Sequence, residues 1–325
     1  MLSRTAENLY WMARHIERAE NTARMLDVAH RSALVPLDLE SADAYLWYAP
    51  LNITGCAAGY EEKYGLARSE AVTRYMALDP ENPSSIYSCL RNARENARAV
   101  RGAITSEMWE VINGTWLEML RQAETFDANR QSDFFEWVKD RSHLFRGVTL
   151  GTIIKDVSLS FIRLGTFLER ADNSARILDV KYHILLPSVN DIGGAADYYQ
   201  WGSLLRSISA FEAYRKIYRD VISPNKVAEL FILRDDMPRS LHACFNEIEM
   251  ALSHINGEGG REVRRLAGEI HAHLHFGRIE DIYASGLHEY LTAFLASTDA
   301  LGREIRNAYL SRRSDLVTEK FPRAA

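Results

Sequence analysis

The chain carries the stretch ERAENTARMLDV at residues 17–28, and a close copy, ERADNSARILDV, recurs at residues 169–180. Nine of the twelve positions are identical. The three differences replace Glu20 by an aspartate, Thr22 by a serine and Met25 by an isoleucine, which keeps the charge, the hydroxyl and the apolar character. We therefore predict a tandem duplication, with a first half at residues 1–150 and a second at 151–325 that together form one compact domain.

Other pairs of segments extend the predicted repeat beyond this motif. NPSSIYSCL at residues 82–90 parallels MPRSLHACF at residues 237–245, and Trp47 and Tyr60 parallel Trp201 and Tyr214. The halves diverge near Ile255. The predicted repeat thus covers most of each half.

Both copies of the motif have the periodicity of an α-helix. At roughly 100° per residue, Glu20 and Asp27 point into the apolar face that Leu9 and Ile16 define. Arg18 is expected to point the opposite way, toward solvent or a partner. The candidate site residues are the polar members of the two copies: Glu17, Arg18, Glu20, Asn21, Arg24 and Asp27, and Glu169, Arg170, Asp172, Asn173, Arg176 and Asp179.

Carboxylates that face a core are costly unless they are paired or hydrogen-bonded. We therefore expect the two motif helices to pack about a pseudo-twofold axis, with Arg24 meeting the carboxylates of the second copy and Arg176 those of the first. Two interpretations stay open. The motif is either an ion network that fixes helix register, or a polar groove that binds a charged substrate, a peptide or a metal.

The rest of the sequence predicts an all-α protein, an internally duplicated multi-helix bundle with pseudo-twofold related halves. Hardly any segment alternates with the two-residue period of a strand. Helices are expected at about residues 3–32, 42–63 and 158–186, with breaks near Pro36, after Pro187 and at residues 257–260, and a frayed tail after Ser314.

Composition narrows the possible partners and compartment. A net charge of -5 argues against nucleic-acid binding, and no apolar run reaches the roughly 18 residues of a membrane span. The chain begins directly in an amphipathic helix, so we expect no signal peptide. Cys56, Cys89 and Cys244 lie far apart without a CxxC pair, which predicts reduced thiols and a cytoplasmic location.

No familiar catalytic or cofactor motif is present. The sequence lacks GxGxxG, Walker, GxSxG and CxxC patterns. A di-iron bundle needs Glu-x-x-His, but Glu17 and Glu169 are followed at that spacing by Glu20 and Asp172. His271 and His275, one helical turn apart, are able to share a metal, but no third ligand is nearby in sequence apart from Glu269 and Glu280. Surface or capping histidines are the favoured interpretation, and we predict no metal and no cofactor.

Several segments resemble the bacterial alpha-E family of α-helical proteins with a Glu-Arg motif. The similar segments are LSR at residues 2–4, LYWM at 9–12, ERAENTAR at 17–24, NPSSI at 82–86, RNARENAR at 91–98 and GLHEYL at 286–291. The resemblance covers essentially the whole chain. It implies a helical partner of a circularly permuted ATP-grasp ligase, accompanied by a transglutaminase-like peptidase and sometimes a proteasome-like peptidase. That setting implies ATP-dependent amide-bond formation on a peptide or small amino acid.

The sequence favours an accessory or substrate-presenting subunit of such a ligase. In this hypothesis Arg24 and Arg176 bind carboxylates in bidentate fashion, while the motif carboxylates bind an amine or hold the arginines. The alternatives are a stand-alone metal-dependent enzyme that uses the carboxylate cluster, and a purely structural scaffold.

Overall fold

The structure is a computed structural model that describes residues 1–33, 42–184, 195–255 and 260–310. The breaks predicted near Pro36, Pro187 and residues 257–260, and the predicted tail, lie outside the described residues. Within them the protein is helical and contains no strand. This confirms the all-α prediction.

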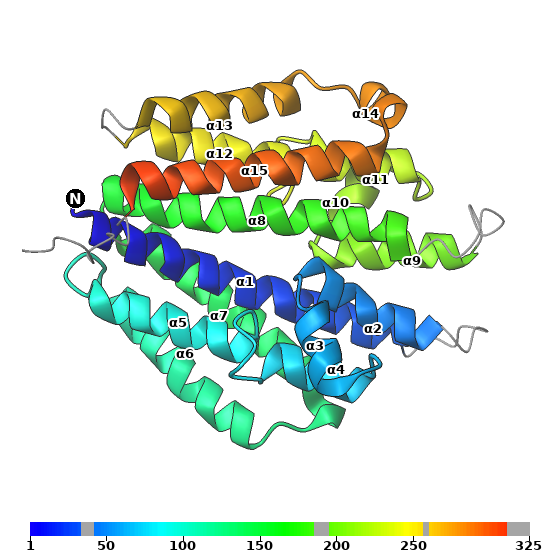
Figure 1. The fold of residues 1–325 in the computed structure, drawn as a ribbon, viewed down its shortest axis with the longest axis horizontal. Helices are drawn as coiled ribbons and strands as arrows, with labels where there is room; N and C mark the ends of the chain where they lie inside the picture. Colours follow the sequence, from blue (N-terminus) through cyan, green and yellow to red (C-terminus); the bar gives the residue numbers. More distant parts are fainter. Residues whose placement is uncertain (34–41, 185–194, 256–259, 311–325) are drawn as a thin grey trace, which may run out of the picture.

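The chain forms two long helices, each followed by shorter ones (Figure 1). The first series is α1 (Ser3–Ala33), α2 (Ala42–Ile53), α3 (Ala57–Tyr64), α4 (Ser69–Ala77), α5 (Ile86–Ala99), α6 (Ser106–Glu124), the 3-10 turn η1 (Ala128–Arg130) and α7 (Gln131–Thr152). The second is α8 (Val157–Ile184), α9 (Ala195–Ser207), α10 (Phe211–Tyr218), α11 (Pro224–Ile232), α12 (Leu241–Ser253), α13 (Gly260–His275), α14 (Ile279–Ser285) and α15 (Leu287–Tyr309).

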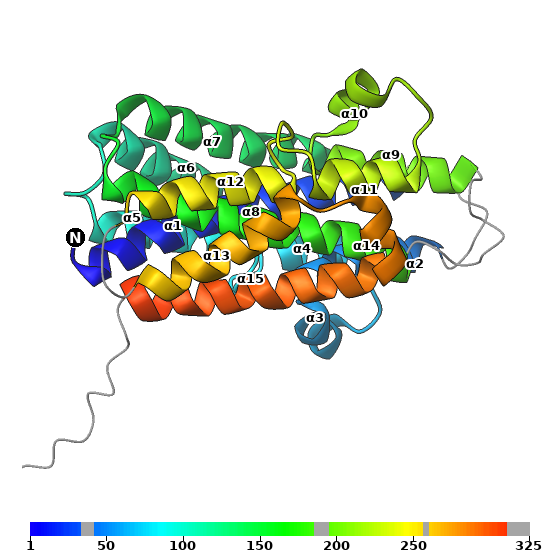
Figure 2. The same cartoon turned by 90° about the horizontal axis from the view of Figure 1, so that it is seen from above.

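The two motif helices, α1 and α8, lie side by side at the centre of the bundle (Figures 1 and 2). They run parallel, because residues of rising number on α1 meet residues of rising number on α8. Their closest approach is at Gly165, where a Cβ atom would lie 2.2 Å from the carbonyl oxygen of Tyr10. Only a residue without a side chain allows the two backbones to come this close.

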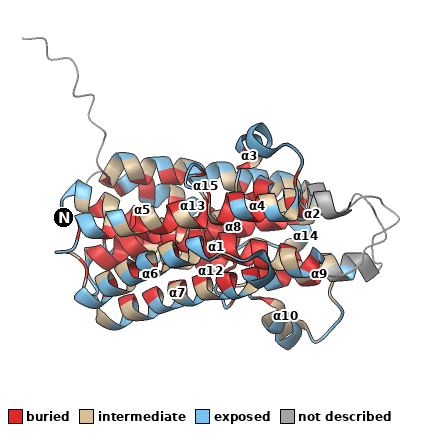
Figure 3. Ribbon diagram, turned by 90° about the horizontal axis from the view of Figure 1, so that it is seen from below, coloured by how far each residue is buried: buried red, intermediate tan, exposed pale blue. Residues whose placement is uncertain are grey.

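Different helices cover the outer sides of this central pair. Helices α5 and α7 pack against α1, whereas α12 and α15 pack against α8. Buried residues therefore concentrate along α1 and α8, as Figure 3 shows. Motif side chains on these helices lie inside the protein and require partners there.

Helix ends are set by recognisable local contacts. Ser85 caps α5 by accepting a hydrogen bond from the backbone nitrogen of Ser88 (3.1 Å), and Ser240 caps α12 by accepting one from that of Ala243 (3.0 Å). The helix predicted over residues 42–63 is interrupted, because Gly55 has a positive φ of 68° that ends α2 before α3 begins. The resulting corner at residues 53–55 lines the site described below.

No helix of the described part is long and apolar enough to cross a membrane. The three cysteines are all buried and unbonded to one another.

Candidate functional site

The Glu-Arg pair of each motif exchanges ion pairs with the Glu-Arg pair of the other. Arg170 donates to both carboxylate oxygens of Glu17, from Nε at 2.9 Å and from Nη2 at 2.8 Å. Arg18 donates in the same bidentate way to Glu169, at 2.6 and 3.0 Å. The expectation that Arg18 points away from α8 is therefore wrong. Its long side chain reaches back along the helix surface to the carboxylate of the neighbouring helix.

The expectation that Arg24 and Arg176 cross between the motifs is also wrong. Arg24 donates from Nε to Glu20 of its own helix at 2.9 Å, and Arg176 donates from Nε to Asp172 at 2.8 Å. Both pairs are four residues apart, which places their side chains one above the other on a helix. Each arginine therefore binds the nearer acceptor on its own helix rather than a carboxylate of the other copy.

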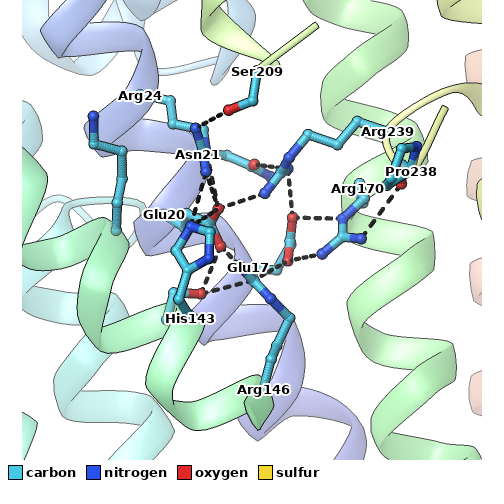
Figure 4. A network of polar contacts seen from close by, with 12 residues as sticks. Glu17, Glu20, Asn21, Arg24, His143, Arg146, Arg170, Ser209, Pro238 and Arg239 are labelled. Atoms are coloured by element: carbon cyan, nitrogen blue, oxygen red, sulfur yellow. Dashed lines mark hydrogen bonds and ion pairs between the residues drawn. The ribbon is translucent and has the colours of Figure 1, made fainter. Parts of the chain in front are cut away.

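The first motif copy is closed into a buried ion network (Figure 4). Arg239, from the loop before α12, donates to Glu17 at 2.8 Å and to Glu20 at 2.5 Å. Arg146 of α7 donates to both carboxylates, and Ser142 donates to Glu20 at 2.6 Å. We call Glu17, Glu20, Arg24, Arg146, Arg170 and Arg239 the closed network.

The closed network keeps its carboxylates ionised. Burial alone raises the pKa of Glu17, but Arg170 and Arg239 outweigh burial and lower it below the ordinary value. Burial acts on Glu20 in the same way, and Arg239, Arg146 and Arg24 lower its pKa further still. Glu17 and Glu20 are no more than 1% exposed, so these charges depend on the arginines for their solvation.

The second motif copy is more open. Glu169 is buried and binds Arg14 at 2.7 Å as well as Arg18. Burial raises its pKa, but the two arginines reverse that effect and lower the pKa to about 2. The side chains of Asp172 and Arg176, in contrast, are 27% and 41% exposed, whereas their counterparts Glu20 and Arg24 are 0% and 10% exposed.

A polar cleft of about 310 Å³ lies beside this open copy. Its walls come from α1, α8, α15, the corner between α2 and α3, and Ser84 of the loop before α5. Its charged lining consists of four arginines and three carboxylates among the described residues: Arg14, Arg18, Arg176, Arg306, Glu169, Asp172 and Asp299. This volume is at the lower end of the range of small-molecule sites.

The lining of the polar cleft contains polar groups without partners. Nδ2 of Asn21, Oγ1 of Thr22 and Oγ1 of Thr298 are buried and form no hydrogen bond within the described part of the chain. The side chain of Arg306 likewise forms no hydrogen bond or ion pair with any described residue. Buried polar groups are normally satisfied, so such a cluster in one cleft indicates that a ligand or solvent supplies the missing partners.

Of the remaining predicted site residues, only the two asparagines belong to these two regions. Asn21 joins the closed network through Oδ1, which accepts from Arg239 at 3.0 Å, and Asn173 lines the polar cleft. Asp27 instead binds Arg31 and Lys139, at 2.9 and 3.0 Å, and Asp179 binds His288 at 2.7 Å. Asp27 and Asp179 therefore belong to neither the closed network nor the polar cleft.

Sequence reasoning missed several important residues. Arg239 had a detectable signal, because it replaces the serine found at the matching place of NPSSIYSCL. Arg14 lies one turn before Arg18, on the same helix face. Arg146, Thr298 and Arg306 lie outside the segments recognised in the sequence, and only the fold brings them to the site.

These features define a class of helical bundle whose two central parallel helices are joined by reciprocal Glu-Arg pairs. The chain belongs to the Alpha-E family, described as a predicted alpha-helical domain with a conserved ER motif, which matches residues 1–310.

Similar curated proteins carry no functional description. The chain is 24% identical to the uncharacterized protein Mb2597 of Mycobacterium bovis and 23% identical to the uncharacterized protein Rv2567 of Mycobacterium tuberculosis. Each similarity covers 93% of this chain but 36% of the relative, so the chain spans about a third of the length of these proteins. No solved structure is significantly similar.

Proposed function

We propose that this protein is a non-catalytic, cytoplasmic helical subunit that binds a small amino compound in the polar cleft and presents it to an ATP-grasp amide ligase. The compound is an amino acid or the end of a peptide, with one cationic and one anionic group. The observation that supports the proposal most directly is that the charge of Asp172 is only partly neutralised by the protein, beside a cleft of small-molecule size.

The proposal rests on a duplicated origin of the two halves, which matching local contacts support. Ser85 and Ser240 each cap a helix and also donate to a backbone carbonyl six residues earlier. Tyr60 and Tyr214 each donate to a backbone carbonyl and accept from a backbone nitrogen in the loop that follows. Such details are expected when two halves share an ancestor.

Comparison of the two halves suggests what the polar cleft binds. Glu20 accepts hydrogen bonds from Arg24, Arg146 and Arg239. Its counterpart Asp172 accepts them, among described residues, from Arg176 alone. At the place of Arg239 the first half has Ser84, which lines the cleft. A ligand ammonium or guanidinium group would therefore take the place that Arg239 occupies in the closed network.

The residues of α15 that line the cleft suggest the charge at the other end of the ligand. Arg306 offers an unpaired guanidinium, which suits a carboxylate. Thr22, Thr298 and the Asn21 amide offer hydrogen-bonding groups between the two charges. The cleft thus has complementary groups for both ends of a zwitterion.

The partner is proposed from the family resemblance and from the length of the relatives. The chain has no nucleotide-binding motif, so activation of a carboxylate by ATP would require a second protein. Relatives in which this region makes up only part of the chain agree with a module that works beside another domain. A metal-dependent enzyme at the closed network is disfavoured, because guanidinium groups already contact the carboxylates of Glu17 and Glu20.

The test is to fill the cleft with the missing guanidinium by Ser84→Arg. Calorimetry should find a class of free amino acids or dipeptides that binds the wild type. The N-acetylated and the C-amidated forms of these compounds should each bind at least about tenfold more weakly. Ser84→Arg should remain folded and lose this binding. The matched control Ser253→Arg, which adds the same charge at an exposed site on α12, should keep it.

The two parts of the proposal fail separately. If no compound of the panel binds the wild type, or if Ser84→Arg binds as tightly as the control, the cleft is not the ligand site. Co-purification with a circularly permuted ATP-grasp ligase from the same genome tests the partner. If the two proteins do not associate, with or without ligand, the subunit role is wrong and a scaffold with another partner replaces it.

A further inference from the structure

Three histidines on two packed helices come together outside the closed network and the polar cleft. His242 lies on α12, and His271 and His275 lie on α13, which packs along α12 (Figure 2). One ring nitrogen of each lies within 4.8 Å of one nitrogen of each of the others. The fold thus supplies the third ligand that the neighbourhood of His271 and His275 in the sequence lacks.

The distances suit a tetrahedral metal. Two imidazole nitrogens bound to tetrahedral zinc, each about 2.0–2.1 Å from the ion, are about 3.4 Å apart. Nε2 of His242 and Nδ1 of His275 are separated by 3.4 Å. His271 follows one turn before His275 on the same helix, and its ring stacks on that of His275 with centroids 5.8 Å apart. One nitrogen of His271 also lies within 4.8 Å of a nitrogen of each of the other two rings, which completes a three-nitrogen face.

Two of the rings are already held by contacts typical of metal ligands. Nδ1 of His242 lies 2.9 Å from the backbone oxygen of Leu233, so it donates its proton there and Nε2 keeps a lone pair. Nε2 of His271 lies 2.7 Å from Oδ1 of Asn246, which leaves Nδ1 of His271 as the lone-pair nitrogen. Hydrogen bonds of this kind fix the tautomer and orientation of metal-binding histidines.

The chemistry of the three side chains suits a transition metal. No carboxylate belongs to the group, so the ligand set is neutral nitrogen only. Such ligands suit Zn²⁺, Cu²⁺ and Ni²⁺ better than Mg²⁺ or Ca²⁺.

We propose that His242, His271 and His275 form a binding site for a divalent transition metal of the Zn²⁺ class, with a fourth position open to water or an external ligand. His275 is exposed, so the ion reaches the site from solvent. His242 is buried between its bond to Leu233 and the α13 histidines, so the ion joins α12 to α13. The site shares no residue with the polar cleft, and it stands or falls independently of the proposed function.

The test uses the untagged full chain after treatment with a chelator. Titration with Co²⁺ should give one equivalent of binding with the visible absorption of a tetrahedral nitrogen site, and Zn²⁺ should displace the Co²⁺. His271→Ala and His275→Ala should each weaken binding at least about tenfold. His273→Ala is the matched control, since it removes an exposed histidine of the same helix that is not in the group.

Thermal unfolding gives a second readout. Zn²⁺ at about one hundred times Kd should raise the Tm of the wild type and of His273→Ala by about 5 °C, and should not raise that of His275→Ala. Absence of Co²⁺ binding at micromolar concentration overturns the proposal. So does binding that survives in both His271→Ala and His275→Ala, because the ion would then be bound elsewhere.

Discussion

Replacement of Glu169 by glutamine should destabilise the protein through one well-defined pair of contacts. Glu169 is held by Arg14 at 2.7 Å and by Arg18 at 2.6 and 3.0 Å. The substitution preserves shape but removes the negative charge, so two guanidinium groups are left facing a neutral amide. Since the arginines are largely buried, water replaces the lost charge poorly.

The pKa of Glu169 sets the expected magnitude. It falls from an ordinary value of 4.5 to about 2, because the two arginines outweigh the effect of burial. At 1.36 kcal/mol for each tenfold change in the acid constant, the folded state gains about 3 kcal/mol from ionised Glu169. A folded-state pKa below the unfolded one means that this stability is present above pH 4.5 and is lost as pH falls toward 2.

Urea unfolding of the wild type and Glu169→Gln measures this contribution. At pH 7 the variant should be less stable by about 3 kcal/mol, and the difference should shrink steadily below pH 4.5. A double-mutant cycle that combines Glu169→Gln with Arg18→Met should show a coupling of at least ~1 kcal/mol in the free energy of unfolding. Glu262→Gln, which breaks an exposed ion pair with Arg265 on α13, is the control and should leave stability unchanged. A variant within 0.5 kcal/mol of the wild type, or a difference that does not respond to pH, would refute the reasoning.

Three further predictions follow from single positions. Gly165→Ala should lower the free energy of urea unfolding by at least ~2 kcal/mol, because its Cβ would meet the Tyr10 carbonyl. Gly147→Ala, with open space around it, should be neutral or slightly stabilising, and equal effects of the two substitutions would contradict the close crossing of α1 and α8. Burial raises the pKa of Cys89 and Cys244 to about 12, so a thiol reagent at pH 8 should leave both unmodified in the native protein and label them after denaturation; rapid native labelling would argue against their burial. Burial, aided by Arg18, lowers the pKa of His15 to about 4, so the wild type should lose stability between pH 6.5 and 4 as the unfolded chain takes up the proton. His15→Leu should reduce the slope of stability against pH in this range, and an unchanged slope would show that His15 does not cause it.

The sequence was sufficient to predict the helical character of the chain, because this depends on local periodicity, and the adjacency of the two motif helices, because buried charges need partners. Heptad-like spacing of apolar residues placed Glu20 inside the protein correctly, and its burial is complete. The partner of each charge was harder to predict. Arg18 reaches a carboxylate of the other motif whereas Arg24 reaches one on its own helix, and periodicity does not resolve that choice.

Residues from other helices were beyond prediction for a different reason. Arg146 and Arg306 contact the site only because α7 and α15 pack on opposite sides of the central pair. Their own segments carry no sign of this, since an arginine on an amphipathic helix is usually at the surface. The His242 ligand in the proposed metal site was hidden in the same way, as it joins His271 and His275 only through the packing of α12 on α13.

The reciprocal geometry gives a physical reason for an adjacent glutamate and arginine in each motif. Positions 17 and 18 of α1 lie level with positions 169 and 170 of α8, so each glutamate reaches the arginine of the other helix: Glu17 meets Arg170, and Arg18 meets Glu169. Neither pair would form if one helix kept the order and the other reversed it, because like charges would then face each other. Each dipeptide thus neutralises the other in the buried contact between the helices.

The same arrangement separates the structural role of the motif from the binding role that we propose. The exchange between Glu17, Arg18, Glu169 and Arg170 joins α1 directly to α8. The acidic residue one turn later is therefore free to differ between the halves: Glu20 is enclosed by Arg239, whereas Asp172 faces the polar cleft. Loss of binding in Ser84→Arg without loss of stability would separate these roles, because the new arginine would fill the cleft while the ion pairs of Arg18 and Glu169 at its wall still form.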